Sequence, residues 1–252
     1  MITFGDLKAQ HHSQSVMPCS ATSAVRAVAL LFCVLAPAAA KSYDKTADIA
    51  GTPVHYKLIL PKTYDESKAY PAILAFPPGA QTADMVLTTV ERNWRPEAER
   101  RGYIVIVPAA PGGRLFYEEG ARVFPAFIEQ MLREYKIRDN KFHIAGMSNG
   151  GISAFFLAAA YPQYFVSITG FPGYLQDATP ERIKAISKMC IDMYVGELDT
   201  GWRTQMQQQA AQLRAQGMSV HFSVEKDQGH VMSTLAGDGA GRLFDQIEKS
   251  CK

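Results

Sequence analysis

Short, unbroken runs of apolar residues alternate along this chain with segments of helical periodicity, and this alternation limits the possible folds most. Residues 71–76 (PAILAF) and 103–107 (YIVIV) are typical of strands covered on both faces of a sheet. Further strands are predicted at 54–60, 142–146, 165–170, 191–195 and 220–224, and helices at 121–136, 152–160, 203–216 and 241–249. The sequence therefore predicts an α/β fold with a mostly parallel central sheet and helices on both faces.

The predicted elements follow one another closely, without internal repeats or low-complexity linkers. We therefore expect residues 41–252 to form one domain without a large cap domain. In a parallel sheet, ligands bind at the carboxyl ends of the strands, so candidate site residues are sought in the loops that follow strands.

The charge balance makes nucleic acid an unlikely class of partner on physical grounds. The 252 residues include 26 basic and 24 acidic side chains, a formal net charge of +2, and no long block of like charge. A protein that binds a phosphate backbone concentrates positive charge along one face. We expect no nucleic-acid partner.

The first forty residues differ in composition from the rest. Residues 27–40 (AVALLFCVLAPAAA) are uncharged and mostly apolar, and they follow Arg26. A membrane span needs about twenty apolar residues, so the run fits a secretory signal peptide that is cleaved after its small residues near Ala40. Residues 1–16 form a polar prefix, so Met17 is an alternative start. The prediction is a signal peptide over 1–40, export to the periplasm or the exterior, and no membrane association after cleavage; the alternative is a buried alanine-rich helix.

Two of the four cysteines remain after such cleavage, because Cys19 and Cys33 leave with the leader. Cys190 and Cys251 would then lie in a compartment that permits disulfides. A Cys190–Cys251 bridge is the prediction, and two separate buried thiols are the alternative. The mature chain shows no metal-ligand spacing such as C-x-x-C.

The most informative motif is Gly146-Met147-Ser148-Asn149-Gly150, a G-x-S-x-G pattern between a predicted strand and a predicted helix. In this context the serine occupies a sharp turn and is exposed at the sheet edge, as a nucleophile. A serine hydroxyl is a weak nucleophile and needs a positioned base. The alternative is a glycine-rich turn with an incidental serine.

His230 is the best candidate for that base, because it lies in a loop after the last predicted strand. The other histidines lie in the leader (His11, His12) or inside predicted strands (His55, His143, His221). Asp199 follows the strand at 191–195 and completes the chain order serine, acid, histidine. Glu197 is the nearest alternative to Asp199.

Acyl transfer also needs N–H donors for a developing oxyanion. Asn149, the residue after the serine, is one candidate. The other donor is expected in the loop 77–82, where two prolines lack N–H groups and leave Gly79, Ala80 and Gln81, with Ala80 or Gln81 preferred. An ordinary Pro-Gly turn is the alternative.

On these residues the chain resembles the compact secreted α/β-hydrolases, namely esterases of the dienelactone hydrolase, feruloyl esterase and polyhydroxybutyrate depolymerase-like group. The resemblance runs from Val54 to Lys249 and rests on the segments 146–151 and 161–165, the turn from Gly196 to Asp199, and Gly229-His230. The oxyanion loop of that group usually reads His-Gly-x-x-Gln-Thr, and residues 77–82 (PPGAQT) keep only the Gln-Thr.

The resemblance implies a serine hydrolase that cleaves carboxylic esters through an acyl-enzyme on Ser148, with His230 as base and Asp199 as the acid that orients it. It implies no cofactor and no metal, and a small-molecule or polymer-end ester as substrate. Trp202, Trp94 and Tyr117 are candidate substrate contacts, because aromatic rings can stack on an aryl or acyl group. The alternatives are a serine peptidase of the prolyl-oligopeptidase type and a non-catalytic exported binding module of the same fold.

Overall fold

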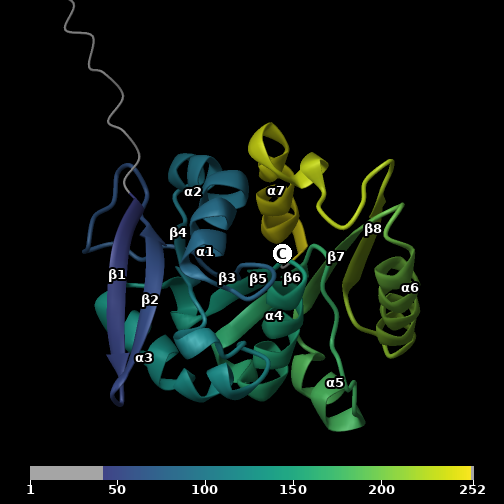
Figure 1. Ribbon diagram of the computed structural model, residues 1–252, viewed down its shortest axis with the longest axis horizontal. Coiled ribbons are helices and arrows are strands. Elements are labelled where there is room, and N and C mark those ends of the chain that lie inside the picture. Colours follow the sequence, from purple (N-terminus) through teal and green to yellow (C-terminus); the bar gives the residue numbers. More distant parts are fainter. Residues whose placement is uncertain (1–41, 251–252) are drawn as a thin grey trace, which may run out of the picture. The chain divides into compact units, whose positions relative to one another are not determined.

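An eight-stranded sheet forms the centre of the part of the chain that the structure, a computed structural model, describes, residues 42–250 (Figure 1). Its strands are β1 (Ser42–Ile49), β2 (Thr52–Ile59), β3 (Ala72–Phe76), β4 (Ile104–Pro108), β5 (Phe142–Gly146), β6 (Phe165–Gly170), β7 (Cys190–Gly196) and β8 (Val220–Glu225). They lie in the order β1-β2-β4-β3-β5-β6-β7-β8. From β4 to β8 all neighbours are parallel, as predicted.

The other end of the sheet is antiparallel, and its outermost strand was not predicted from the sequence. β1 pairs with β2, and β2 pairs with β4, both in antiparallel register. Along β1 only Ala47 and Ile49 are buried, so the strand lacks the apolar run that marks the inner strands. An edge strand with one partner can remain polar because solvent reaches much of it.

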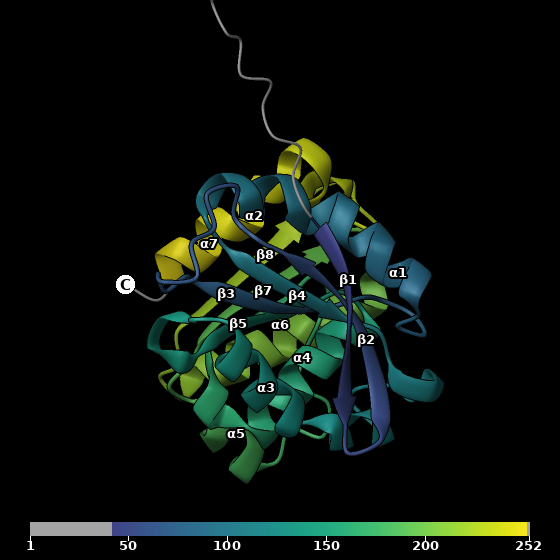
Figure 2. The same cartoon turned by 90° about the vertical axis from the view of Figure 1, so that its left-hand side faces the viewer.

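Helices cover both faces of the sheet (Figure 2). They are α1 (Ala83–Thr89), α2 (Arg95–Arg101), α3 (Ala126–Glu134), α4 (Asn149–Ala160), α5 (Pro180–Ile186), α6 (Thr200–Ala215) and α7 (Gly241–Ser250). α1, α2 and α7 pack on one face, and α3 to α6 pack on the other. Within β3, Ile73 and Ala75 face the first group of helices and Leu74 and Phe76 face the second, the two-residue period of a strand.

The helix predicted over 121–136 is interrupted near its start. Residues Glu119–Val123 form a 3-10 helix, Phe124 is extended, and α3 begins only after Pro125. Proline cannot donate the backbone hydrogen bond that an α-helix interior requires, and it disfavours helical backbone in the residue before it. The apolar stripe correctly predicts α3, but the predicted helix begins five residues before α3 does.

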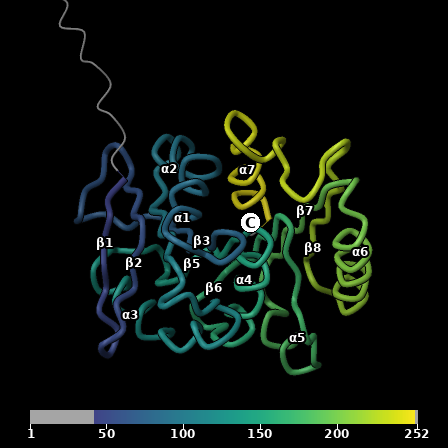
Figure 3. Tube along the Cα trace, viewed as in Figure 1, coloured from purple at the N-terminus to yellow at the C-terminus, as the bar shows by residue number. Residues whose placement is uncertain are grey.

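From β5 onward the strands lie across the sheet in chain order, β5, β6, β7 and β8 (Figure 3). β8 forms the edge of the sheet opposite β1, and α6 packs against both β7 and β8. The loop after β7 and the loop after β8 therefore leave neighbouring parallel strands at the same sheet edge. Residues 196–200 and 226–232 are brought together in this way.

Trp94 belongs to the core, so the expectation that it contacts substrate is wrong. It ends a π-helix, Val90–Trp94, and its side chain is fully buried. The indole packs edge-on against Phe171 at 5.8 Å and Phe244 at 5.7 Å between ring centroids. No local pattern indicates this packing, because Phe244 of α7 lies far from Trp94 along the chain.

Some predictions concern residues outside the described range. The signal peptide over 1–40 and Cys251 lie there, so the leader and the Cys190–Cys251 bridge stay predictions. Cys190 begins β7, and Ser250, the residue before Cys251, donates a hydrogen bond to the buried Asp192 of β7 at 2.8 Å. Within residues 42–250, no helix is both long and apolar enough to cross a membrane.

The core position of Trp94 predicts a large loss of stability on truncation. Trp94→Ala is expected to lower the free energy of unfolding by about 3–5 kcal/mol, because it leaves a cavity between α2, α7 and the sheet. Trp202→Ala, at a half-buried position, is expected to cost less than half as much. Guanidinium denaturation followed by circular dichroism measures both, and equal losses in the two variants would contradict the assignment of Trp94 to the core.

Candidate active site

Ser148 occupies a strained turn between β5 and α4. Its backbone has φ of 58° and ψ of −121°, a region that residues with a side chain rarely adopt. The Ser148 N–H donates to the carbonyl of Pro172 at 2.8 Å, which holds the turn against the loop after β6. The helix begins at the next residue, Asn149, so the hydroxyl lies at the amino end of α4.

The glycines of the motif allow this turn to pack against neighbouring backbone. A Cβ atom on Gly150 would collide with the carbonyl oxygens of Phe76 and Pro77, and one on Gly146 would collide with the carbonyl of Gly150. A side chain at position 150 would push the turn away from the end of β3, and one at position 146 would distort the turn itself. The close contact brings Ser148 beside the loop 77–82.

The structure brings the three predicted residues Ser148, His230 and Asp199 together. His230 Nε2 lies 2.8 Å from Ser148 Oγ, and His230 Nδ1 lies 2.6 Å from Asp199 Oδ2. A carboxylate only accepts hydrogen bonds, so the Nδ1 proton points to Asp199 and neutral Nε2 accepts the serine proton. The arrangement is that of a nucleophile, a base and an acid that orients the base.

Glu197, the alternative acid, has another contact. Its carboxylate accepts the backbone N–H of Asp227 at 3.0 Å, and its own N–H donates to the carbonyl of Glu225. These bonds tie the loop after β7 to the loop that carries His230. Glu197 therefore supports residues 226–232, the loop that carries His230 (the base loop), and Asp199 contacts the imidazole.

An ion pair between a buried carboxylate and a half-exposed arginine anchors the other side of the loop that carries His230, and it was not predicted from the sequence. Glu225, at the end of β8, is 5% exposed and accepts two hydrogen bonds from Arg242 of α7, at 2.6 and 2.9 Å. Thr234 and Ser223 donate to the same carboxylate. Burial alone would raise the pKa of Glu225, but these hydrogen bonds, led by that of Arg242, outweigh burial and hold the pKa below its usual value.

The loop 77–82 contains one predicted oxyanion donor that is already engaged. The Gln81 N–H donates to the carbonyl of Pro78 at 3.1 Å, so the prediction of Gln81 as a backbone donor is wrong. Ala80 remains, exposed at the tip of the same turn. Asn149, the other predicted donor, lies in the first turn of α4, and its side chain donates to the carbonyl of Gly79 at 2.9 Å. Ala80 and Asn149 thus come from two segments that are joined directly.

The two remaining aromatic candidates lie in different surroundings. The Trp202 ring packs edge-on against His230 at 5.1 Å between centroids and against Tyr174 at 5.2 Å. Tyr117 is half-buried and makes no hydrogen bond or ring contact with the three triad residues among the described residues. Of these two aromatic residues, Trp202 is the one whose ring contacts His230.

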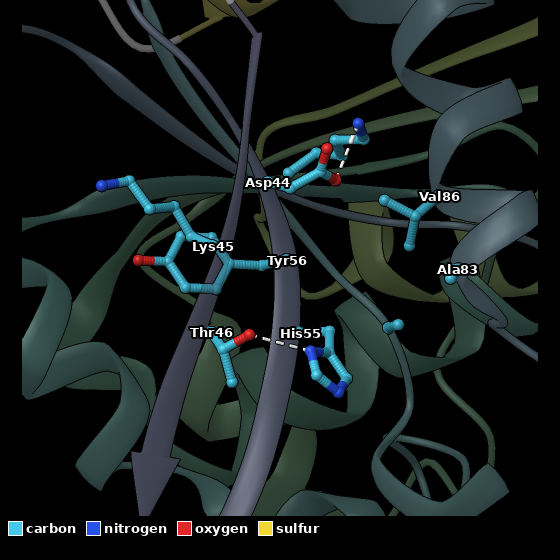
Figure 4. A pocket seen from close by; sticks show the side chains of 9 residues that line it. Asp44, Lys45, Thr46, His55, Tyr56, Ala83 and Val86 are labelled. Carbon is cyan, nitrogen blue, oxygen red and sulfur yellow. Dashed lines mark hydrogen bonds and ion pairs between the residues drawn. The ribbon is translucent and has the colours of Figure 1, made fainter.

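A hollow of about 280 Å³ lies between the β1–β2 hairpin and α1 (Figure 4). Val86 and Ala83 line one wall and His55 lies across from them, with its Nδ1 2.9 Å from Thr46 Oγ1. No triad residue lines this hollow. Within residues 42–250, no group of three or more His, Cys, Asp or Glu side chains is placed to hold a metal ion.

Comparison with known proteins finds similarity both in sequence and in structure. No family model matches the chain. A stretch of 159 residues is 29% identical to dipeptidyl-peptidase 5 of Porphyromonas gingivalis and covers 57% of this chain but only 23% of that protein. The feruloyl esterase module from Clostridium thermocellum superposes with a TM-score of 0.64 at 13% identity, covering 86% of this chain and 88% of that one. S-formylglutathione hydrolase from Agrobacterium tumefaciens gives 0.62 at 14% identity, over 83% and 94%.

These superpositions decide the fold. The chain has the α/β-hydrolase fold. In this fold the nucleophile lies on the turn between a strand and a helix, and the acid and the base follow later strands in that chain order. In this protein the turn before α4 and the loops after β7 and β8 lie at these places.

The ion pair beneath the base loop predicts a pH-dependent loss of stability. Arg242→Met is expected to lower the free energy of unfolding at pH 7 by about 2 kcal/mol, because it leaves a buried carboxylate without its main partner while Arg242 itself is half exposed. Since the pKa of Glu225 is depressed, its contribution is present above the unfolded value of about 4.3 and is lost as the pH falls further. The difference between the two proteins should therefore shrink on acidification.

Urea denaturation at several pH values measures this difference. Arg95→Met is the matched control, because Arg95 pairs with Glu91 one turn earlier on the helix surface, where both side chains reach solvent. The control should lose less than about 0.5 kcal/mol. A loss in Arg242→Met that does not change with pH would contradict the role given to Glu225.

Proposed function

We propose that this protein is a serine hydrolase that cleaves carboxylic esters through an acyl-enzyme. The observation that carries the proposal is the continuous hydrogen-bonded chain from Asp199 through His230 to Ser148, with spacings of 2.6 and 2.8 Å. A serine hydroxyl attacks a carbonyl only when a base within hydrogen-bonding distance takes its proton. Three residues from three separate loops meet this requirement here.

The first half-reaction forms the acyl-enzyme. Ser148 Oγ attacks the ester carbonyl carbon, its proton moves to His230 Nε2, and the carbonyl electron pair moves to the oxygen. The N–H groups of Ala80 and Asn149 are the donors proposed for this oxyanion. The tetrahedral intermediate then collapses, the bond to the alcohol oxygen breaks, and the imidazolium returns its proton to the leaving alcohol.

The second half-reaction uses the same groups for water. His230 takes a proton from the water as the water oxygen attacks the acyl carbon. The oxyanion forms again at the N–H groups of Ala80 and Asn149. Collapse breaks the bond to Ser148 Oγ, which recovers its proton from His230, and the carboxylic acid leaves. Asp199 remains ionised throughout and stabilises the imidazolium.

The surroundings of the triad favour esters with a bulky or polymeric portion. Leu198, one residue before Asp199, is 65% exposed, and Val231, one residue after His230, is 49% exposed. The N–H of Leu198 donates to the carbonyl of Gln228, so the two loops lie together. Large apolar side chains beside the acid and the base can contact the apolar part of a substrate that extends out of the site.

The comparisons support the same class of reaction and supply one alternative. Feruloyl esterase and S-formylglutathione hydrolase share the fold with this chain. The sequence relative is a dipeptidyl-peptidase, of which this chain covers about a quarter, and this favours peptide-bond cleavage by the same triad as the second candidate. The two candidates differ in the leaving group that His230 protonates, an alcohol or an amine.

Turnover by a serine variant tests the proposal. Ser148→Ala is expected to lower kcat for p-nitrophenyl acetate at least about a thousandfold, because the acyl-enzyme can no longer form. Ser187→Ala, at an exposed position at the end of α5, is the matched control and should keep full activity. Release of p-nitrophenolate gives both rates.

A dipeptide p-nitroanilide, assayed beside the ester, separates the two candidates. The proposal predicts that kcat/KM for the ester exceeds that for the anilide. Preference for the anilide would replace the proposal with the peptidase. A folded wild-type protein without turnover of either substrate would instead favour a non-catalytic binding module.

A further inference from the structure

Gln81 is fully buried beside the site, and each kind of polar group that it carries has a partner. Its N–H donates to Pro78 at 3.1 Å, and its carbonyl accepts from the N–H of Ala110 at 2.8 Å. Its side-chain oxygen accepts from the N–H of Phe116 at 3.0 Å, and its side-chain nitrogen donates to Ser153 Oγ at 3.0 Å. One residue therefore joins the loop 77–82 to α4 and to two places in the segment after β4.

The bond to Ser153 leads directly to the first turn of α4. Ser153 is fully buried, and its hydroxyl donates to the carbonyl of Asn149 at 2.9 Å. Asn149 follows Ser148 and provides one of the two proposed oxyanion donors. The Gln81 side chain is thus linked through the Ser153 hydroxyl to the carbonyl of Asn149, the first residue of α4.

Ala80, the other proposed donor, is held from both sides. The Gly79 carbonyl before it accepts from the Asn149 side chain at 2.9 Å, and Gln81 after it is fixed by Ser153 and Phe116. Gln81 also has φ of 54°, which turns the chain sharply behind Ala80. The distance between the two donors depends on these bonds more than on apolar packing, since Ala80 itself is exposed.

We propose that the Gln81 side chain is a positioning residue of the oxyanion site, which fixes the N–H of Ala80 relative to the N–H of Asn149. The inference rests on the proposed ester hydrolysis and adds to it a residue that contacts neither substrate nor triad. A glutamine fits because this position needs one acceptor and one donor on a side chain of this length. An apolar replacement leaves the Phe116 N–H and the Ser153 hydroxyl without their partner.

Gln81→Leu tests the inference, because leucine keeps the apolar volume and removes both side-chain hydrogen bonds. We expect kcat for p-nitrophenyl acetate to fall about a hundredfold with KM changed less than about threefold, since donors displaced by about 1 Å fail mainly in the transition state. Rates are normalised to the number of active sites titrated in each protein. This normalisation removes the effect of any unfolded fraction.

A trifluoromethyl ketone gives a second readout. Ser148 Oγ adds to the ketone carbon, its proton moves to His230, and the ketone oxygen becomes an oxyanion at the proposed donors. Its inhibition constant in Gln81→Leu should rise by about the factor by which kcat falls. A purely structural role for Gln81 would leave this constant unchanged.

Gln209→Leu is the matched control. Gln209 of α6 is also buried, and its side chain also makes two hydrogen bonds, both to the backbone of Leu175 at 2.8 Å. The control should lower the thermal midpoint and leave kcat and the inhibition constant within about twofold of the wild type. The comparison separates loss of a buried glutamine from loss of this particular one.

Gln81→Glu is a second variant, which tests the role of the Gln81 side chain if Gln81→Leu does not fold. A neutral carboxylic acid can donate to Ser153 and accept from Phe116, whereas a carboxylate can only accept. Burial raises the pKa of such a carboxyl group, so the activity of the variant relative to wild type should increase as the pH falls from about 8 to about 6.

Two results would overturn the inference. One is a leucine variant with wild-type kcat and wild-type ketone inhibition per titrated site. The other, where only the glutamate variant folds, is a relative activity that does not change with pH. If the wild-type protein itself turns over no ester, the proposed function fails and the inference with it, so the two failures are told apart by the wild-type rate.

Discussion

The close contact between the turn before α4 and the end of β3 is the constraint on which the site depends. It exists because Gly150 has no side chain to collide with the carbonyl oxygens of Phe76 and Pro77. This contact places Ser148 beside the loop 77–82, so that nucleophile and oxyanion donors come from adjoining backbone. The Asn149 side chain and Gln81 then hold the two segments together by hydrogen bonds.

The base and the acid reach the serine from the other side of the site by a different route. β7 and β8 are parallel neighbours, with Gly196 opposite Glu225, so the loops that follow them begin at the same level of the sheet. Hydrogen bonds of Glu197 and the Glu225–Arg242 pair fix these loops. The serine is thus held by strained backbone and glycine contacts, whereas the histidine is held by charged side chains, and acid should loosen the second before the first.

Much of this could be predicted from the sequence, where the information is local. Apolar runs marked the parallel strands, and the motif around Ser148, with the loops carrying Asp199 and His230, marked residues that the structure brings together. β1 was missed because its pattern is mostly polar, and the helix predicted over 121–136 began too early because Pro125 prevents α3 from starting before Ala126. The core position of Trp94 and the Glu225–Arg242 pair could not be found, because each depends on contacts between residues distant in the chain.

The central claim is that Ser148 is activated by His230, and covalent labelling tests it without a choice of substrate. The protein is treated with a fluorophosphonate, which transfers its phosphonyl group to an activated serine with loss of fluoride, and peptide mass spectrometry locates the adduct. We predict a single adduct on Ser148 in the wild type and a labelling rate lowered at least about a thousandfold in His230→Ala. Labelling elsewhere, or equal labelling of Ser148 in both proteins, would contradict the account.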